Sequence, residues 1–380
     1  MHNAAFNPYL EGLRSFIASA TSHNSEDLED RFNRLALQLF ALQFDAVPVY
    51  RNFCKTQGVI PQSVSSFENI PAVPAGAFKD LELTSLGPEE RTTVFNSSGT
   101  TGQTRSQHFH SADSLKIYEA SLLPWFERHF LSDWSDIIAD RSGSFSEKPG
   151  IIFLTPSPAL APHSSLVHMF ETVRKAFASP DSIFAGSVAG DGSWHLEMDR
   201  VMFGLRKSMC ANRPICLLGT AFLFVHLLDH FDANNIRYKL AAGSRILETG
   251  GYKGRSRELP KNELHQLLSR RLGVPQSHIA CEYGMSELSS QAYDIDIGQP
   301  QTSGRLFRLP PWARFRVISP ETGRDQAEGQ PGLLRLFDLA NVRSVMAIQT
   351  EDLAVRRGDG FELLGRAMLS EPRGCSLMSA

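Results

Sequence analysis

The stretch Phe95-Asn96-Ser97-Ser98-Gly99-Thr100-Thr101-Gly102-Gln103-Thr104-Arg105-Ser106 points most directly to the fold. The six residues from Ser97 to Gly102 are all Ser, Thr or Gly. Glycine lets main-chain N–H groups approach an anion closely, and the hydroxyls add further donors. The planar, permanently charged side chain of Arg105 suits phosphate. The stretch therefore predicts a polyphosphate-binding loop, although it lacks the Walker A pattern and a plain polar turn is the alternative.

The composition bounds the class of protein. A chain of 380 residues with 42% hydrophobic and 21% charged residues is an ordinary globular sequence with room for two or three domains. A net charge of -3 argues against nucleic acid as the main partner. The sequence shows neither a run of about 18 apolar residues nor a signal peptide, so we expect a cytoplasmic protein without a membrane span. Five cysteines without a C-x-x-C pair argue against a disulfide framework.

Periodicity along the chain predicts an α/β fold. Residues 1–90 are expected to be helical, with Ser25 as the N-cap of one helix. From about residue 150, short apolar runs alternate with helical patterns, which is typical of buried parallel strands. These runs are 151–154, 215–218 and 279–281. Further strands are predicted at 314–318, 332–337, 344–348 and 361–364, which would form a β-rich C-terminal segment.

A second motif, Glu282-Tyr283-Gly284-Met285-Ser286-Glu287, follows one of the predicted strands. Ligands of open α/β sheets bind at the carboxyl ends of strands. Tyr283 offers a flat face to a purine, Ser286 a hydroxyl, and Glu287 an oxygen ligand to a hard cation such as Mg²⁺. The alternative is a strand-to-helix turn with a capping Ser and a surface Glu.

Two shorter motifs follow near the C-terminus. In Thr350-Glu351-Asp352 a carboxylate is available for ribose hydroxyls, and in Gly365-Arg366 a glycine precedes a cation. Each is weak alone, because isolated charged residues usually belong to solvated faces. The order of the four motifs along the chain is what makes them informative.

In this order the motifs resemble those of the adenylate-forming enzyme superfamily. Its members carry a Ser/Thr/Gly phosphate loop, Tyr-Gly-x-Thr-Glu, Thr-Gly-Asp and Gly-Arg, and use ATP to convert a carboxylate into an acyl-adenylate that passes to a thiol. The resemblance implies an α/β adenylate-forming large domain with N-terminal helices and a β-rich C-terminal segment. The ATP site that it implies consists of Ser97, Ser98, Gly99, Thr100, Thr101, Gly102 and Arg105 at the triphosphate, Gly250, Gly251 and Tyr283 at adenine, Gly284, Ser286 and Glu287 at the phosphates and Mg²⁺, Asp352 at the ribose and Arg366 beside it.

The chain departs from the superfamily pattern in three places. The phosphate loop ends in Thr104-Arg105-Ser106 where Pro-Lys-Gly is usual, and Glu351 stands where Gly is usual. The superfamily normally continues past Gly-Arg into a mobile small domain with a catalytic Lys, whereas fourteen residues follow Arg366. We therefore expect no small domain. The expected organisation is a helical segment over 1–90 packed on the core, an ATP- and acyl-binding core over 91–366, and a tail over 367–380.

Within the superfamily, the chain is similar to the acyl-protein synthetase (LuxE) family. The similarity rests on residues 95–106 with His108, on 283–291 (YGMSELSSQ) and on 373–377 (RGCSL). In that family a cysteine near the C-terminus accepts the acyl group as a thioester and delivers it to a partner protein. The resemblance thus implies Cys375 as acceptor, ATP and Mg²⁺ as cofactors, a fatty acid as substrate and a reductase or carrier as partner. Only a cysteine thiolate combines nucleophilicity near neutral pH with thioester chemistry, although a stray thiol at a chain end is the alternative.

Three further residues are candidates for the acyl site. His163 lies in the loop after the 151–154 strand and could meet the carboxylate, and Gly219 and Thr220 end an apolar run that could wall an acyl pocket. Packing roles are the alternative for all three. Two other functions remain open. One is a ligase that acylates coenzyme A or a carrier-protein thiol, with Cys375 incidental. The other is a non-catalytic nucleotide-binding relative, which the departures at Arg105 and Glu351 leave open.

Overall fold

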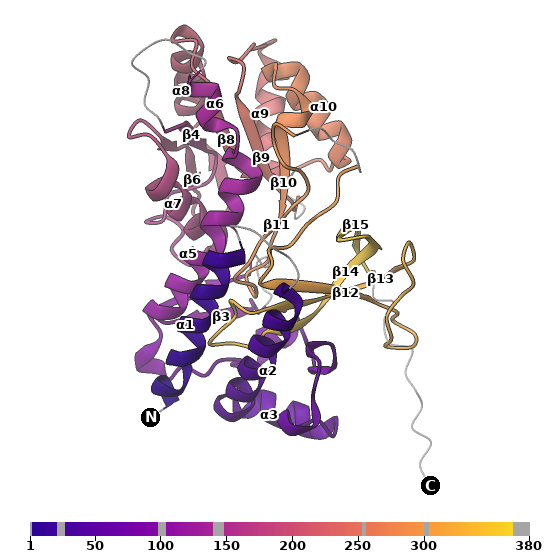
Figure 1. The fold of residues 1–380 in the computed structure, drawn as a ribbon. Helices are drawn as coiled ribbons and strands as arrows, with labels where there is room; N and C mark the ends of the chain where they lie inside the picture. Colours follow the sequence, from indigo (N-terminus) through magenta and orange to yellow (C-terminus); the bar gives the residue numbers. More distant parts are fainter. Residues whose placement is uncertain are drawn as a thin grey trace.

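A six-stranded sheet runs through the upper part of the molecule in Figure 1. The structure is a computed structural model that describes residues 2–20, 27–97, 104–139, 148–252, 256–299 and 304–367. The strand order is β11-β10-β9-β8-β4-β5, and all neighbours are parallel except β11, which is antiparallel to β10. The strands are β4 (Gly150–Phe153), β5 (Ile183–Phe184), β8 (Ile215–Thr220), β9 (Arg245–Thr249), β10 (Ile279–Tyr283) and β11 (Ala292–Tyr293).

Helices cover both faces of this sheet, so its strands are apolar throughout. Ile152, Leu217 and Ile246 share a core with α8, α9 and α10. Phe153, Leu218 and Leu247 point the other way, into a core shared with α5 and α7. This double burial explains the continuous apolar runs in the sequence and confirms the predicted α/β fold. The helices are α5 (Ala112–Phe126), continued by a π-helical turn (Glu127–Leu131), α6 (Trp134–Ala139), α7 (Ser165–Phe177), α8 (Met198–Cys210), α9 (Ala221–Ala233) and α10 (Lys261–Leu272).

A second, five-stranded sheet is built from the C-terminal part of the chain. Its order is β1-β14-β13-β12, and β15 also pairs with β14. The pairs are antiparallel apart from β1 with β14. The strands are β1 (Val73–Pro74), β12 (Ala313–Ile318), β13 (Pro331–Asp338), β14 (Ala347–Arg357) and β15 (Gly360–Arg366).

Three of the four strands predicted in this region are confirmed, and the one at 344–348 is misplaced. β14 begins only at Ala347 and continues to Arg357. The preceding residues form a buried turn after β13, in which the Asp338 N–H donates to the Met346 carbonyl oxygen at 2.8 Å. The apolar residues that suggested a strand are buried by this turn.

The N-terminal helices are α1 (His2–Ala20), α2 (Leu28–Ala46) and α3 (Pro48–Thr56), of which α1 and α2 contact the turn that follows β13. The Tyr9 hydroxyl donates to the Leu339 carbonyl oxygen at 2.8 Å. The buried Gln43 amide donates to the Asn341 carbonyl oxygen at 2.7 Å and accepts the Met346 N–H at 3.0 Å. The predicted N-cap, Ser25, lies outside the described residues, and α2 starts at Leu28 after Asp27.

Shorter elements complete the fold. The hairpin of β2 (Thr93–Asn96) and β3 (Gln107–His110) carries the Ser/Thr/Gly stretch between its strands, and a second hairpin pairs β6 (Gly186–Val188) with β7 (Trp194–Leu196). The remaining elements are α4 (Ala77–Asp80) and the single 3₁₀ turns η1 (Pro61–Ser63), η2 (Phe67–Asn69), η3 (Pro88–Glu90) and η5 (Gln276–His278). None of the described helices combines the length and apolar character needed to cross a membrane.

Candidate active site

The base of the Ser/Thr/Gly loop is closed by two hydrogen bonds. The Ser97 N–H donates to the Ser106 carbonyl oxygen at 3.1 Å, and the Ser106 N–H donates to the Ser97 hydroxyl at 2.9 Å. The loop is therefore the connection of the β2–β3 hairpin. Its predicted phosphate ligands Ser98, Gly99, Thr100, Thr101 and Gly102 lie outside the described residues, whereas Arg105 is described and exposed.

The segment that follows β10 is anchored by three side chains from two other parts of the chain. His108 of β3 is fully buried, and its Nδ1–H donates to the Ser286 carbonyl oxygen at 2.9 Å. Because that oxygen can only accept, the proton sits on Nδ1. Burial lowers the pKa of His108 to about 4, so the ring is neutral at physiological pH. The Asn341 amide donates to the Glu287 carbonyl oxygen at 2.8 Å.

Asp338, at the end of β13, supplies the third anchor. One carboxylate oxygen accepts the Ser289 and Ser290 N–H groups at 2.9 and 2.8 Å, and the other accepts the Ser290 hydroxyl at 2.8 Å. Burial raises the pKa of Asp338, but these donors favour the ionised form and pull it back. The backbone that carries Ser286 and Glu287 is thus fixed by β3 through His108 and by the end of β13 and the turn after it through Asp338 and Asn341.

Ser286 and Glu287 are bonded to each other. The Ser286 hydroxyl donates to Glu287 Oε2 at 3.0 Å, and both side chains are buried. One carboxylate with a hydroxyl beside it fits a Mg²⁺ ion that is shared with substrate phosphates, since Mg²⁺ usually keeps several waters and takes one or two protein carboxylates. Among the described residues no group of three or more His, Cys, Asp or Glu is placed to hold a metal by itself.

Tyr283, Asp352 and Arg366 come together where the two sheets meet. The Tyr283 hydroxyl donates to Asp352 Oδ2 at 2.8 Å, and Asp352 lies directly opposite Arg366 in the β14–β15 ladder. Arg366 Nε is 3.6 Å from Asp352 Oδ1, and the arginine side chain is exposed. Burial raises the pKa of Asp352, and the Tyr283 hydrogen bond opposes that shift. Three motif residues predicted from separate segments are therefore one contact group.

Gly250 and Gly251 follow β9 at the same carboxyl edge of the sheet. A Cβ at Gly250 would meet no atom within 4 Å. Gly251 has a φ of 108°, which favours glycine. The two residues thus leave open space beside the end of the strand, as expected where a ligand approaches the backbone.

The three acyl-site candidates occupy different positions. His163 is exposed and lies against the phosphate-loop hairpin, where its Nδ1–H donates to the Val94 carbonyl oxygen at 3.2 Å and its carbonyl oxygen accepts the Asn96 N–H at 2.9 Å. Gly219 faces Leu154, in the core shared with α8 to α10. Thr220, the next residue, points to the opposite face of the sheet. Cys375, the predicted acyl acceptor, and the rest of 368–380 lie outside the described residues.

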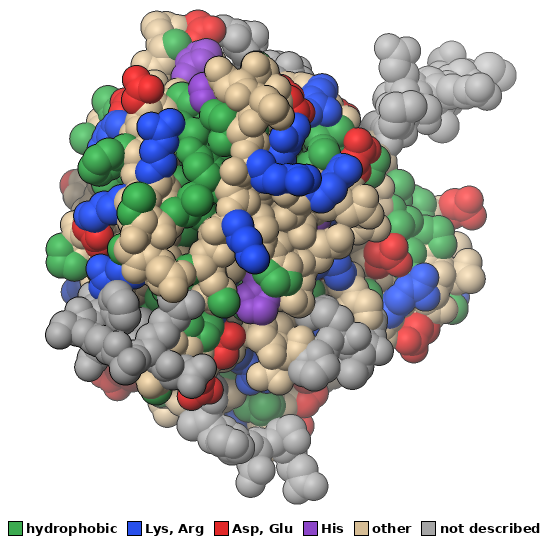
Figure 2. Space-filling model, turned by 90° about the horizontal axis from the view of Figure 1, so that it is seen from above, with side chains coloured by type: hydrophobic (Ala, Val, Ile, Leu, Met, Phe, Trp, Pro, Cys, Tyr) green, Lys and Arg blue, Asp and Glu red, His purple; other side chains and the backbone are tan. Residues whose placement is uncertain are grey.

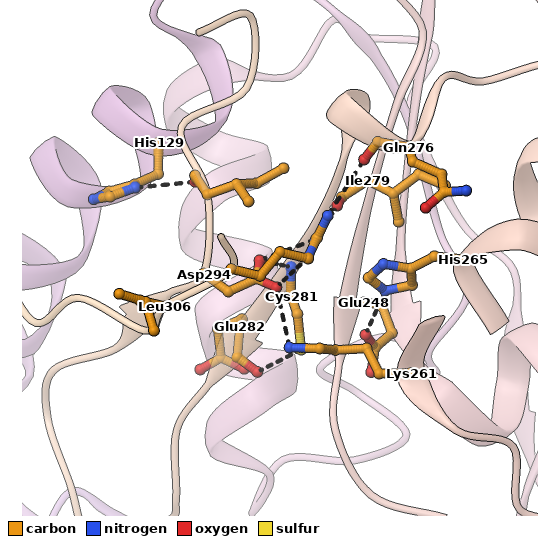
Figure 3. A network of polar contacts seen from close by, with 12 residues as sticks. His129, Glu248, Lys261, His265, Gln276, Ile279, Cys281, Glu282, Asp294 and Leu306 are labelled. Atoms are coloured by element: carbon orange, nitrogen blue, oxygen red, sulfur yellow. Dashed lines mark hydrogen bonds and ion pairs between the residues drawn. The ribbon is translucent and has the colours of Figure 1, made fainter. Parts of the chain in front are cut away.

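A network of polar contacts surrounds Cys281 of β10 (Figure 3). The buried carboxylate of Asp294 accepts the Cys281 N–H at 2.7 Å and contacts Lys261 Nζ at 3.3 Å and Arg305 Nε at 2.7 Å. Glu248 and His265 form a second buried pair at 3.1 Å. These groups pair with one another, so we assign them a structural role.

A cavity of about 120 Å³ lies at the other edge of the sheet, between α8 and the first residues of β4 and β8. Figure 2 views the molecule from above Figure 1 and shows apolar side chains with basic ones beside them on that face. The cavity is lined by Trp134, Ile152, Phe203, Lys207 and Ile215, among others. None of the motif residues lines this cavity. We therefore place the candidate active site at the carboxyl edge of the sheet, where the motif residues lie.

The anchoring residues Asp338, Asn341 and Gln43 were not identified from the sequence. Each is a polar residue between apolar neighbours in the sequence, which suggests that its side chain is buried. A buried polar side chain needs hydrogen-bond partners, and this is the one local signal that could have identified these residues. Besides local contacts, each has a partner far away along the chain, at 48 positions for Asp338, 54 for Asn341 and 303 for Gln43. His108 was noted only as part of a resemblance.

This fold is that of adenylate-forming ligases. The structure matches 2-hydroxyisobutyryl-CoA ligase in the postadenylation state in complex with 2-HIB-AMP with a TM-score of 0.59 at 12% identity, over 89% of this chain and 68% of that one. An open conformation of the same ligase with 2-HIB-AMP and CoA gives the same TM-score at 12% identity, over 90% and 74%.

The chain belongs to the acyl-protein synthetase family LuxE, whose family model matches residues 168–380. Two relatives are similar over almost their whole length, and both are described as long-chain-fatty-acid–luciferin-component ligases. The one from Aliivibrio fischeri is 21% identical over 376 residues, which is 96% of this chain and 92% of the relative. The one from Vibrio harveyi is 22% identical over 372 residues, or 95% and 90%.

Proposed function

We propose that this protein uses ATP to activate a carboxylic acid as an acyl-adenylate, captures the acyl group as a thioester on Cys375 and transfers it to a partner protein. The observation that carries the proposal is the convergence of separate motifs on one site. Tyr283 and Arg366 both contact Asp352. Ser286 and Glu287 follow Tyr283 along the chain, and His108 ties them to the hairpin that carries the Ser/Thr/Gly loop.

The described residues suit an adenine nucleotide. Asp352 uses one oxygen for the Tyr283 hydroxyl, and a carboxylate has spare lone pairs for ribose hydroxyls. Arg366 is exposed beside it and adds positive charge. The open space at Gly250 leaves the backbone accessible to a base. Glu287 would hold Mg²⁺, which neutralises phosphate charge as pyrophosphate leaves.

The proposed reaction is a double displacement without a redox step. A carboxylate oxygen attacks the α-phosphorus of ATP, and the bond to the β-phosphate oxygen breaks to release pyrophosphate. The thiolate of Cys375 then attacks the acyl carbon, and the bond to AMP breaks. In the first step the loop after Ser97 would hold the triphosphate together with Arg105. The two ends of this loop are already fixed by the hydrogen bonds between Ser97 and Ser106.

The other cysteines offer poor alternatives to Cys375. Cys54, Cys216 and Cys281 are buried. Burial raises the pKa of Cys54 to about 11 and that of Cys216 to about 12, which suppresses their thiolates at neutral pH. Cys210 is exposed, but it ends α8, which flanks the cavity at the opposite edge of the sheet.

The names of the relatives support a fatty acid as the substrate and a protein as the acceptor. Both are described as long-chain-fatty-acid–luciferin-component ligases. The second candidate function, transfer to coenzyme A, is favoured by the ligase with bound CoA that shares the fold. In that case Cys375 would be incidental.

The test is the intact mass of the protein after incubation with ATP, Mg²⁺ and a panel of fatty and aromatic acids, measured before and after hydroxylamine. The proposal expects a hydroxylamine-labile acyl adduct on wild type and on Cys210→Ser but not on Cys375→Ala, which should still release pyrophosphate. Pyrophosphate release without an adduct on wild type would favour an external thiol. Neither signal with any acid would overturn the catalytic proposal.

A further inference from the structure

Phe203 is the most exposed large apolar side chain among the described residues. Its exposed fraction is 68%, and the next largest, at Leu160 and Leu364, is 52%. Phe203 lies in the middle of α8, which turns Val201 and Leu205 into the core under the six-stranded sheet. The phenyl ring therefore lies on the outer face of a helix that is already packed on its inner face.

A single exposed apolar residue needs no explanation, but Phe203 is not isolated. It also lines the cavity of about 120 Å³ between α8 and the first residues of β4 and β8. Trp134, Ile183 and Ile215 belong to the same lining. An apolar cavity of about 150 Å³ holds a benzene ring, so this one has room for a short piece of hydrocarbon. The exposed ring and the cavity thus form one apolar patch at the amino-terminal edge of the sheet.

Basic side chains surround this apolar patch, and Figure 2 shows Lys and Arg beside the apolar side chains of this face. The residues of α8 and of the cavity lining include five basic and two acidic side chains, although the chain as a whole has a net charge of -3. The basic ones are Lys148, Arg200, Arg206, Lys207 and Arg213, and the acidic ones are Asp181 and Asp199. The patch therefore carries a charge opposite in sign to that of the whole chain.

The basic side chains of α8 can exchange their partners for an anion. Arg200 pairs with Glu197 at 2.8 Å and Lys207 with Asp181 at 3.1 Å, but the four side chains are between 36 and 55% exposed. Exposed ion pairs contribute little, so a phosphate can replace the carboxylate. Arg206 is exposed and donates from Nε to the Tyr238 hydroxyl at 3.4 Å, and no carboxylate of the described residues pairs with it.

We propose that this face docks on an anionic lipid bilayer, with the Phe203 ring inserted among the headgroups and the basic side chains on lipid phosphates. Aromatic rings favour the membrane–water interface, and basic residues on an amphipathic helix bind anionic lipids. A projecting ring enters a bilayer anywhere, whereas a protein partner needs a pocket made for it. The proposal is independent of the proposed function, because the motif residues lie at the opposite edge of the sheet and stay accessible.

The test is co-sedimentation with vesicles of phosphatidylcholine alone and of phosphatidylcholine mixed with phosphatidylglycerol. Phe203→Asp removes the ring, Phe203→Trp keeps an aromatic side chain and adds a fluorophore, and Arg206→Gln removes one charge. Ile60→Asp is the matched control, because Ile60 is also exposed, at 44%, but belongs to the N-terminal part of the chain. ATP–pyrophosphate exchange with octanoate, a water-soluble acid, checks that the variants remain folded.

Wild type should bind the mixed vesicles and not phosphatidylcholine alone, because the basic side chains need anionic headgroups. Phe203→Asp should weaken binding at least about tenfold and Arg206→Gln about fivefold, whereas Ile60→Asp should bind like wild type. Phe203→Trp should bind like wild type, and the vesicles should shift its fluorescence to shorter wavelength more than that of wild type.

Three results would overturn the proposal: no binding of wild type to either vesicle, equal binding to both, or binding to the mixed vesicles that Phe203→Asp and Arg206→Gln leave unchanged. The first would leave an acidic protein as the occupant of this face. Exchange activity is a separate readout. Its absence in wild type with octanoate and longer acids would count against the proposed function, whereas vesicle binding would still decide the membrane proposal.

Discussion

Replacing His108 tests whether the phosphate-loop hairpin and the Ser286–Glu287 segment act as one unit. The imidazole is buried and donates from Nδ1 to the Ser286 carbonyl oxygen at 2.9 Å. His108→Ala removes the donor. In His108→Asn the amide nitrogen can take the place of Nδ1, whereas in His108→Gln it lies nearer the place of Nε2. The three variants thus separate the hydrogen bond from the bulk of the side chain.

The expected loss follows from the burial of the contact. Leaving the Ser286 carbonyl oxygen without its donor costs about 1–3 kcal/mol. If that cost falls on the transition state, kcat/KM for MgATP drops about 5- to 150-fold. His108→Asn should recover most of the activity and His108→Gln little of it. Because the pKa of His108 is about 4, none of the variants should change the pH dependence of activity between pH 6 and 8.

ATP–pyrophosphate exchange at varied ATP measures the effect, and thermal unfolding followed by circular dichroism controls for folding. A merely structural role for His108 would lower the melting temperature of all three variants while leaving kcat/KM of the folded fraction unchanged. That result would refute the reasoning, as would equal activity of the Asn and Gln variants.

Three further predictions follow from the site. Tyr283→Phe keeps the ring but loses the hydrogen bond to Asp352, so KM for ATP should rise about fivefold, and an unchanged KM in initial-rate measurements would count against a nucleotide role for this contact. Gly251→Ala should destabilise the protein by more than about 1 kcal/mol in urea unfolding, because φ is positive there, whereas Gly250→Ala in open space should cost little. Glu282 has a pKa near 4.5 in the unfolded chain and about 8 in the folded protein, so the folded state retains the proton to a higher pH. Between pH 5 and pH 8.5, wild type should therefore lose on the order of 3–5 kcal/mol of stability relative to Glu282→Gln. Urea titrations of the two proteins in parallel would detect this loss.

The sequence allowed the parts of the site that lie on regular elements to be predicted. The strand before Tyr283 was correctly predicted, because a doubly covered parallel strand is apolar on both faces. Asp352 and Arg366 were each selected, although only the antiparallel register of β14 and β15 puts them opposite each other. The Gly358-Asp359-Gly360 turn could be read from the sequence, but the pairing also depends on a register shift after Leu353, which no local pattern specifies.

What could not be predicted is what holds the site in place. β9 was missed because Arg245 and Glu248 interrupt its apolar run; buried Arg245 pairs with the partly exposed Asp133, and Glu248 with the buried His265 of α10. The same holds for Asp338, whose role depends on the Ser289 and Ser290 N–H groups. A polar residue inside a core is stabilised by partners that are distant in the sequence. The residues next to it in the sequence therefore give little information about its role.

The contact of Gln43 with the turn after β13 has a consequence for how the protein folds. The turn contributes Asp338 and Asn341 to the Ser286–Ser290 segment, and Gln43 reaches it across 298 positions of sequence. Closing so long a segment is an entropically costly and slow event. During synthesis the Ser286–Ser290 segment can therefore be anchored in this way only after residue 346 has left the ribosome and met the N-terminal helices. A fragment that lacks the N-terminal helices should therefore leave this turn without its Gln43 contact.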